Sequence, residues 1–199
     1  MVVESLLEMH FHAALIDLFS RTFGRPFLKM IKPSTRKEYK YGFDQGFVWT
    51  DDLEDQFLSD LETSITAQST RQDRMYLAYF FQFKRVDKIS RNSTYKPATY
   101  HTPYYRSPIS LTPNKFTKLS QHDTLLRLAN IRNAMVYYAC GMIFDQSEVW
   151  EPVDLEKLRF VPLSSSPTNL NLNQSHFITF QTKTDPTPLW CSEPVQGES

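Results

Sequence analysis

The chain has 199 residues and a mass of 23.3 kDa, which is enough for one domain with a sizeable buried core. Hydrophobic residues make up 41% and aromatic residues 14%, which excludes an intrinsically disordered chain, and no apolar run is long enough to span a membrane. The formal net charge is zero, and two cysteines cannot form a metal cluster on their own but fit a reducing compartment. We therefore expect a cytoplasmic protein.

The periodicity of apolar residues predicts an α/β fold in which a central mixed sheet is flanked by helices. In chain order we expect a helix at 2–22, a strand at 27–32, a helical turn at 34–41, strands at 43–49 and 75–88, a short edge segment at 107–111, a helix from 120 or 121 to 133, a strand at 134–143, helical structure within 145–158, and strands at 160–163 and 177–180.

Two stretches fall outside this pattern. Residues 50–73 form an acidic insertion with weak helical periodicity, for which a short helix and a mobile loop are both open. Residues 186–199 are rich in proline and predict a loosely ordered tail. We expect a single domain over residues 1–185 that contains the insertion.

The stretch from Met75 to Lys88 is the most apolar and aromatic of the chain, and it predicts a strand covered on both faces. Gln82 and Lys84 lie near its end. Because residues two apart in a strand share a face, an amide and an ammonium point the same way there. A lysine is costly in such a place unless a negative group lies opposite it.

Asp44 lies near the start of the preceding predicted strand, so it meets Gln82 and Lys84 if the two strands are neighbours. A carboxylate, an amide oxygen, the carbonyl of Phe83 and water are ligands that Mg²⁺ or Mn²⁺ can take. The Lys84 ammonium could then orient or deprotonate a water molecule, or stabilise charge on a phosphate. The alternatives are a turn role for Asp44 and a solvent-exposed strand end at Lys84.

Two further acids could strengthen this site. Glu8 lies on the first predicted helix, one turn from Glu4, and Glu38 lies just upstream of the Asp44 strand. For Glu8, a salt bridge on the helix surface is the alternative.

Charge is segregated along the chain. Residues 51–73 carry 1 basic and 7 acidic residues, and residues 74–133 carry 11 basic and 2 acidic residues. Such segregation indicates a polyanionic ligand better than the net charge does. Basic residues interleave with Tyr95, Tyr100, Tyr104 and Tyr105, as in a groove that follows a nucleic-acid backbone and stacks bases. A solvated loop stabilised by tyrosine packing is the alternative. The candidate nucleic-acid-binding residues are Arg85, Lys88, Arg91, Lys96, Arg106, Lys115, Lys118 and the helix start at Gln121 and His122.

The segments G-F-D at 42–44 and F-F-Q-F-K at 80–84, followed by a helix and a buried strand, resemble the PD-(D/E)XK restriction-endonuclease-like nuclease superfamily. The resemblance covers about residues 4–143 and implies an αβββαβ core and a Mg²⁺- or Mn²⁺-dependent endonuclease acting on DNA, less often on RNA. It assigns the family aspartate to Asp44 and the family lysine to Lys84. Gln82 stands where an acidic residue is usual, although some members carry glutamine.

The resemblance departs from the pattern a second time at Phe43, which replaces the proline before the aspartate. Glu8 matches the glutamate of the family's first helix by its location alone. The segments Q-F-K, P-Y-Y-R, Q-H-x-x-L-L and V-Y-Y-A are also similar to small nuclease-like proteins from bacterial phage-defence loci. That similarity implies an antiviral role, with a second copy of the chain or another defence protein as a partner.

Two other functions remain open. The neutral Gln82 is compatible with a non-catalytic nucleic-acid-binding or assembly subunit that kept the fold and lost the metal. The acidic insertion at 50–73 is compatible with a regulator that covers its own basic groove as a mimic of DNA.

Overall fold

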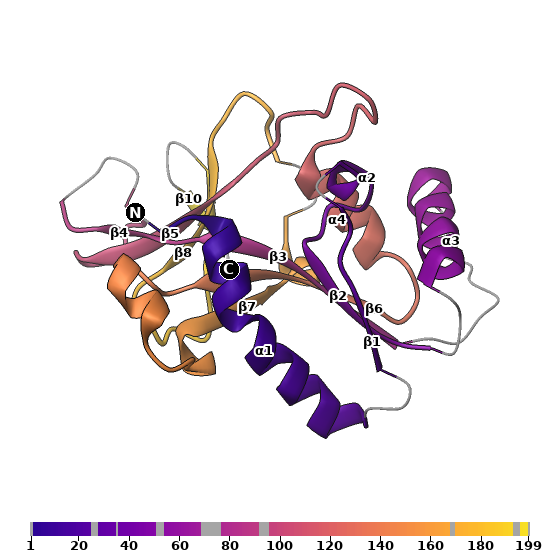
Figure 1. Cartoon of the computed structure of the whole chain (residues 1–199). Coiled ribbons are helices and arrows are strands. Elements are labelled where there is room, and N and C mark those ends of the chain that lie inside the picture. The colour runs from indigo at the N-terminus through magenta and orange to yellow at the C-terminus, as the bar shows by residue number, and fades with distance from the viewer. Residues whose placement is uncertain are drawn as a thin grey trace.

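The computed structural model describes residues 2–24, 28–34, 36–50, 54–68, 77–91, 96–167, 170–192 and 196–198. Ten strands form two five-stranded sheets among these residues, and helices flank the first sheet (Figure 1). The fold is therefore α/β, as expected.

The α-helices are α1 (Glu4–Phe23), α2 (Glu38–Tyr41), α3 (Glu54–Ala67) and α4 (Gln121–Ala129). Short 3₁₀ helices follow later in the chain: η2 (Gln146–Trp150), η3 (Leu155–Lys157) and η4 (Leu163–Ser165). The strands are β1 (Leu28–Ile31), β2 (Gln45–Trp49), β3 (Leu77–Arg85), β4 (Asp87–Ile89), β5 (Tyr104–Ile109), β6 (Ala134–Gly141), β7 (Leu158–Pro162), β8 (His176–Phe180), β9 (Leu189–Ser192) and β10 (Gln196–Glu198).

The first sheet has the strand order β1-β2-β3-β6-β7 and is mixed. Strands β1, β2 and β3 pair antiparallel in succession, and β6 pairs parallel to β3 after the chain has passed through α4. Strand β7 adds an antiparallel edge. The aromatic strand β3 is thus central, with a hydrogen-bonded neighbour on each side, which is what its nearly continuous apolar sequence predicts.

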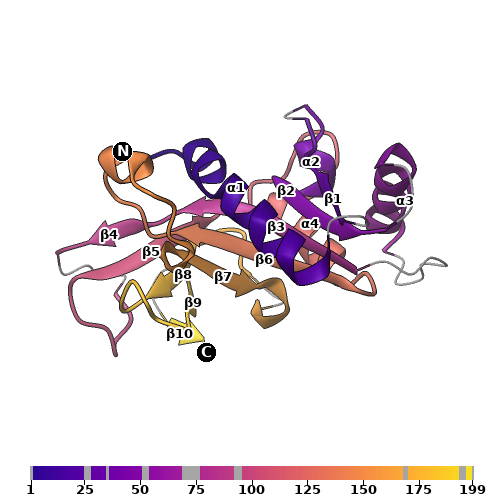
Figure 2. The same cartoon turned by 60° about the horizontal axis from the view of Figure 1, so that its bottom comes forward.

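Alternate side chains of β3 enter two cores on opposite faces of this sheet. Phe81 and Phe83 pack with Leu7 and Phe11 of α1. On the other face, Phe80 packs with residues of α2, α3 and α4 and with the second sheet. Figure 2 shows α1 on one side of β3 and β6, and β8 and β9 on the other. The period of two in β3 therefore directs Gln82 and Lys84 toward the α4 side.

The second sheet has the order β10-β9-β8-β5-β4 and is antiparallel throughout. Its apolar residues Tyr105, Ile178, Phe180 and Trp190 belong to the same core as Phe80. Only Val86 separates β3 from β4, so one nearly continuous stretch of chain contributes to both sheets.

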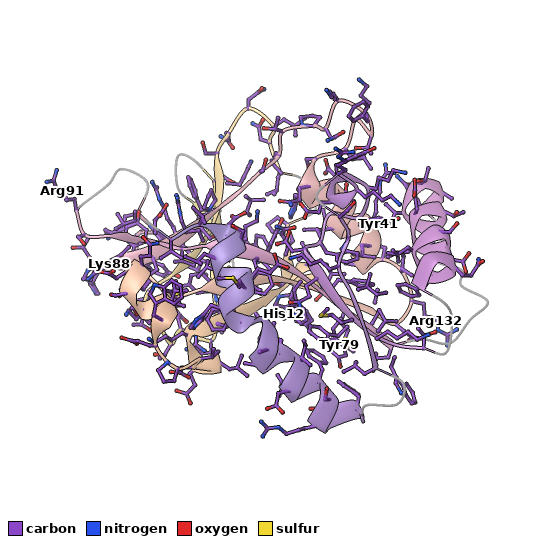
Figure 3. The ribbon with its side chains drawn as sticks, in the orientation of Figure 1. His12, Tyr41, Tyr79, Lys88, Arg91 and Arg132 are labelled. Carbon is purple, nitrogen blue, oxygen red and sulfur yellow. The ribbon has the colours of Figure 1, made fainter. Side chains whose placement is uncertain are left out.

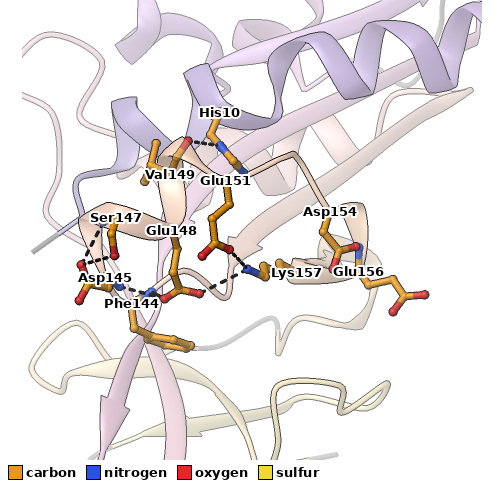
Figure 4. A network of polar contacts seen from close by, with 10 residues as sticks. All are labelled: His10, Phe144, Asp145, Ser147, Glu148, Val149, Glu151, Asp154, Glu156 and Lys157. Carbon is orange, nitrogen blue, oxygen red and sulfur yellow. Dashed lines mark hydrogen bonds and ion pairs between the residues drawn. The ribbon is translucent and has the colours of Figure 1, made fainter.

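A network of polar contacts joins the segment after β6 to α1 (Figure 4). The ring of His10 contacts the carbonyl oxygen of Val149 at 2.8 Å. The Asp145 and Glu148 side chains form a capping box at the start of η2, and Lys157 lies 3.4 Å from Glu148. These contacts hold the two 3₁₀ turns beneath the helix.

Most expected strands are found within a few residues of their expected bounds. The edge segment expected at 107–111 overlaps the end of β5, where residues 107–109 pair with β8 and, unlike residues 104–106, not with β4. The helical structure expected within 145–158 consists of the 3₁₀ helices η2 and η3, separated by an extended stretch at Pro152. The prediction of a loosely ordered tail is wrong. The tail from 186 contributes β9, paired to β8, to the second sheet; residues 193–195 and 199 lie outside the described part of the chain.

The acidic insertion at 50–73 contains a helix, α3, which settles the choice between helix and loop for its described residues. Residues 51–53 and 69–73 lie outside the described part of the chain. No helix in the described ranges is both long and apolar enough to cross a bilayer.

Candidate functional site

Asp44 lies one residue before β2, where its side chain continues the hydrogen-bond ladder to β3. Its backbone N–H donates to the carbonyl of Phe81 at 2.9 Å, and its Oδ2 accepts from the backbone N–H of Phe83 at 2.7 Å. The same Oδ2 accepts from Nε2 of Gln82 at 2.8 Å. The expected approach of Asp44 to the end of the aromatic strand is therefore found, and the register of the sheet fixes it.

Gln82, Gln121 and Lys84 form a chain of side-chain contacts beside Asp44. Oε1 of Gln82 accepts from Nε2 of Gln121 at 2.8 Å, and Oε1 of Gln121 accepts from Nζ of Lys84 at 3.0 Å. Lys84 is 6% exposed, and its ammonium also lies 3.7 Å from Glu4 and 5.8 Å from the centre of the Tyr138 ring. A buried ammonium thus has an amide oxygen, a carboxylate and an aromatic face around it, which offsets its desolvation.

The two auxiliary acids both act on Asp44 through their charges. Glu8 of α1 is buried and forms a 2.6 Å ion pair with Lys32, which follows β1. Glu38 opens α2 and is close enough to Glu8 and Lys32 for their charges to act on it. The structure therefore brings Glu8 and Glu38 into the electrostatic environment of Asp44, and it adds Lys32.

Burial and neighbouring charges alter the acidity of two of these carboxyl groups. Burial is the main cause that raises the pKa of Asp44 from 3.8 to about 7; Glu8 and Glu38 raise it further, while the Phe83 N–H and Lys84 lower it. Burial and the charge of Glu8 raise the pKa of Glu38, and Lys32 opposes them. Carboxyl groups whose pKa is shifted by burial and by neighbouring charges are typical of sites that perform acid–base chemistry.

Helix α4 presents Gln121 to the site through its N-cap. The Ser120 hydroxyl accepts from the backbone N–H of Asp123 at 3.0 Å, and the Asp123 carboxylate accepts from the backbone N–H of Ser120 at 3.1 Å. This reciprocal capping box fixes the first turn, and Gln121 is its first residue.

Gly42 brings the chain entering Asp44 close to this turn. Its φ of +79° is left-handed, and a Cβ there would lie 3.2 Å from side-chain atoms of Leu125 and Thr124 and 3.3 Å from the Gln121 carbonyl. Only glycine meets both demands without strain.

The donor set of the site suits a hard cation in part. Within the described ranges, no three His, Cys, Asp or Glu side chains form a group that could hold a metal ion. However, the Gln82 amide nitrogen lies 2.8 Å from Asp44 Oδ2 and 3.3 Å from the Phe83 carbonyl oxygen. Because amide orientation is assigned from the network, a rotated Gln82 would present its oxygen to the same pair. One carboxylate, two neutral oxygens and water form an acceptable Mg²⁺ ligand set.

A groove of about 570 Å³ begins at this site. Glu38, Gly42 and Gln121 line the end next to Asp44 and Lys84. The rest of the wall is formed by Tyr39 and by the segment 112–119, including Asn114 and Lys115. The site is therefore reached from solvent along a wall that carries polar and basic groups.

The expected nucleic-acid-binding residues separate into two groups. Lys115 and Gln121 line the groove and Lys118 lies in the same segment as Lys115, whereas Arg85, Lys88, Arg91, Lys96 and Arg106 lie on or near β4 and β5. Figure 3 shows Lys88 and Arg91 at the β4 end, far from Tyr41 of α2. In the second group Arg85 pairs with Asp87 at 3.1 Å, Lys96 donates to the Pro97 and Tyr100 carbonyls, and Arg106 stacks over Phe177 at 4.5 Å.

His122 and the tyrosines do not have the exposure that their expected roles require. His122 is 1% exposed, contacts the Tyr138 hydroxyl and the Ser166 hydroxyl, and has its pKa lowered to about 4 by burial, so its neutral ring belongs to the core. The α4 N-terminus is bonded by its own cap rather than left for a phosphate. Tyr100, Tyr104 and Tyr105 are buried, the last two as residues of β5, which excludes base stacking; Tyr95 lies outside the described residues.

Sequence reasoning did not single out Lys32, and it gave Gln121 a peripheral role instead of its central one. The signal for Lys32 was its place at the end of a predicted strand that precedes the Asp44 strand, since antiparallel neighbours bring such ends together. Comparison of the chain with protein-family models, with curated proteins and with solved structures finds no match.

Proposed function

We propose that the protein is a Mg²⁺- or Mn²⁺-dependent nuclease that hydrolyses phosphodiester bonds of DNA. One observation carries the proposal: Asp44, Gln82, the Phe83 carbonyl and Lys84 converge where β2 begins and β3 ends, with Glu8 and Glu38 acting on Asp44.

The order of elements gives further support. Helix α1, the antiparallel strands β1, β2 and β3, helix α4 and the parallel strand β6 occur in the αβββαβ order that the resemblance implies, with α2, α3, β4 and β5 inserted between them. Asp44 immediately precedes β2 and Lys84 lies near the end of β3, at the positions to which the resemblance assigns them.

The chemistry divides between the cation and the side chains. A divalent cation held by Asp44, Gln82 and the Phe83 carbonyl would polarise a phosphate oxygen and lower the pKa of water. Lys84 supplies a fixed positive charge toward the negative charge that develops on the phosphate, in a site where low exposure strengthens that interaction. Glu38, whose pKa is raised, is the group suited to accept the proton of the attacking water.

The decisive assay incubates purified protein with supercoiled plasmid and with linear DNA, in Mg²⁺, in Mn²⁺ and in EDTA. We expect cleavage with either cation and none in EDTA. Lys84→Met keeps the length of the buried side chain and Asp44→Asn keeps its hydrogen bonds, and each should reduce the rate at least 100-fold. Matched controls are Lys157→Met, which breaks an ion pair of η3, and Asp60→Asn on α3. Wild-type rates in the Asp44 or Lys84 variants would refute the proposal.

A second function is favoured by one observation, the saturation of the Gln82 amide. Its nitrogen bonds Asp44 and the Phe83 carbonyl and its oxygen bonds Gln121, so the network is complete without a cation. This closed network suits a nucleic-acid-binding subunit with no catalysis. Calorimetry with Mn²⁺ separates the two: saturable heat that Asp44→Asn abolishes supports the nuclease, and no heat alongside intact DNA binding supports the subunit.

A further inference from the structure

An aromatic pair lies beside the groove. Phe116 is 66% exposed, and its ring lies 5.5 Å from that of the half-buried Tyr39 at an angle of 37°. Tyr39 itself lines the groove, next to Glu38. The groove wall therefore runs from Gly42 and Gln121 to Tyr39, whose ring contacts an aromatic face open to solvent.

The turn that carries Phe116 is held by its own hydrogen bonds. The Asn114 side-chain oxygen accepts from the backbone N–H of Phe116 at 2.8 Å, and the backbone of Asn114 bonds Leu119 and Lys118 at 2.8 and 2.9 Å. Phe116 is thus displayed by an ordered turn. Exposing a large apolar ring in this way costs free energy that burial would have recovered, which indicates a binding role.

The surroundings of the ring are basic. Lys115 and Lys118 flank Phe116 in the sequence and are exposed, and the Lys115 ammonium lies 4.8 Å from the centre of the Phe116 ring. Arg36 and Lys37, which precede Glu38 in the sequence, are also exposed. Aromatic faces between cations match a ligand that alternates flat bases with phosphates.

Other exposed aromatic residues lack this setting. Trp150 is 77% exposed and lies on η2, away from the residues that line the groove, and its neighbours Val149 and Glu151 are apolar and acidic. Trp150 therefore serves as a matched control for exposure alone.

We propose that Phe116 and Tyr39 stack an unpaired base of the substrate, and that the substrate is consequently single-stranded DNA or a single-stranded end. In a duplex, each base already stacks on its neighbours and its faces are closed to a side chain. This inference rests on the proposed function, because the bound DNA strand is taken to lead from Phe116 toward Asp44 and Lys84. The stacking itself can be measured without cleavage.

Binding is measured by fluorescence anisotropy with a labelled 15-nucleotide single strand and the corresponding duplex, in EDTA to exclude chemistry. We expect the wild-type protein to prefer the single strand at least tenfold, and Phe116→Ala to weaken that binding about tenfold. Phe116→Trp should restore the affinity, and the new indole should be quenched on binding. Trp150→Ala should bind as the wild type does.

A strand of the same length that carries abasic sites tests whether the ring contacts bases. The loss caused by Phe116→Ala should vanish with this strand, because only the phosphates remain to be bound. Equal affinity for duplex and single strand, or an equal effect of Phe116→Ala on the abasic strand, would overturn the inference.

The assay also separates the two proposals. Cleavage of DNA with no effect of Phe116→Ala on binding or on strand preference would leave the nuclease intact and refute base stacking. Base-dependent binding through Phe116 without cleavage in Mg²⁺ or Mn²⁺ would support base stacking and refute the nuclease.

Discussion

Asp44→Asn should make the protein more stable at neutral pH while removing its activity. The pKa of Asp44 is about 7 in the folded protein and 3.8 in the unfolded chain, so the folded protein holds this proton more tightly than the unfolded chain does. The stability that protonated Asp44 contributes to the folded state is therefore fully present below pH 3.8, and it is lost as the pH rises toward and through 7. Asparagine does not titrate and can still accept from the Phe83 N–H.

The magnitude follows from the size of the shift. One pKa unit corresponds to about 1.4 kcal/mol, so the whole shift is worth about 4 kcal/mol, of which roughly 2–3 kcal/mol falls between pH 5 and pH 8. Urea unfolding of the wild type and of Asp44→Asn, in EDTA at pH 5, 6, 7 and 8, gives the difference in the free energy of unfolding at each pH. Taking the difference removes titrations common to both proteins.

We expect the advantage of Asp44→Asn to grow steadily by that amount between pH 5 and pH 8. Asp60→Asn on α3 removes a carboxylate elsewhere in the molecule and is the control, and its difference from wild type should not follow that of Asp44→Asn. Mn²⁺ should reduce the advantage, because a cation stabilises the ionised wild-type carboxylate. A difference that is constant with pH, or that falls as the pH rises, would refute the reasoning about burial of Asp44.

Three further predictions concern the ligands and the supports of the site. Gln82→Glu adds a second carboxylate beside Asp44, so it should bind Mn²⁺ at least tenfold more tightly in calorimetry and lose stability in EDTA at pH 8; unchanged Mn²⁺ affinity would remove Gln82 from the ligand set. Gly42→Ala places a Cβ on a residue with left-handed backbone and against Leu125, so thermal unfolding should show that the free energy of unfolding falls by about 1–3 kcal/mol. An unchanged free energy of unfolding would contradict the close approach of Gly42 to α4. Ser120→Ala should cost about 1 kcal/mol in urea unfolding through loss of the helix cap, and Ser120→Asp, which can still cap, should recover most of it.

The centre of the site could be predicted from the sequence because two simple features of a sheet determine it, the alternation of side chains along a strand and the pairing of neighbouring strands. The alternation of β3 gives Gln82 and Lys84 one face, and the antiparallel pairing of β2 with β3 brings Asp44 beside them. The part played by Gln121 could not be predicted, because its contact with Gln82 crosses 39 residues and depends on the capped first turn of α4. Helix periodicity alone does not fix where such a turn lies.

The basic and aromatic stretch after β3 was misinterpreted for a physical reason. Tyr100, Tyr104 and Tyr105 stand among lysines and arginines, a pattern typical of a binding surface, yet all three are buried. Tyr104 and Tyr105 lie in β5, which pairs with β8 from more than 70 residues further along the chain, and the Tyr100 hydroxyl donates to the Thr179 carbonyl of β8. A side chain's exposure depends on what packs over it, and local composition carries no information about that partner. For the same reason the second sheet could not be predicted from the sequence, since its strands are short and separated by long connections.

The bond from the Phe83 N–H to Asp44 makes one backbone amide a reporter of the site. This amide hydrogen exchanges with deuterium only when its hydrogen bond to Asp44 breaks. Its protection from exchange would therefore change with the protonation of Asp44 and with any ion that competes for Oδ2. The Phe83 amide would therefore report on the state of Asp44, where β2 begins and β3 ends, at a single nuclear spin and without any substrate.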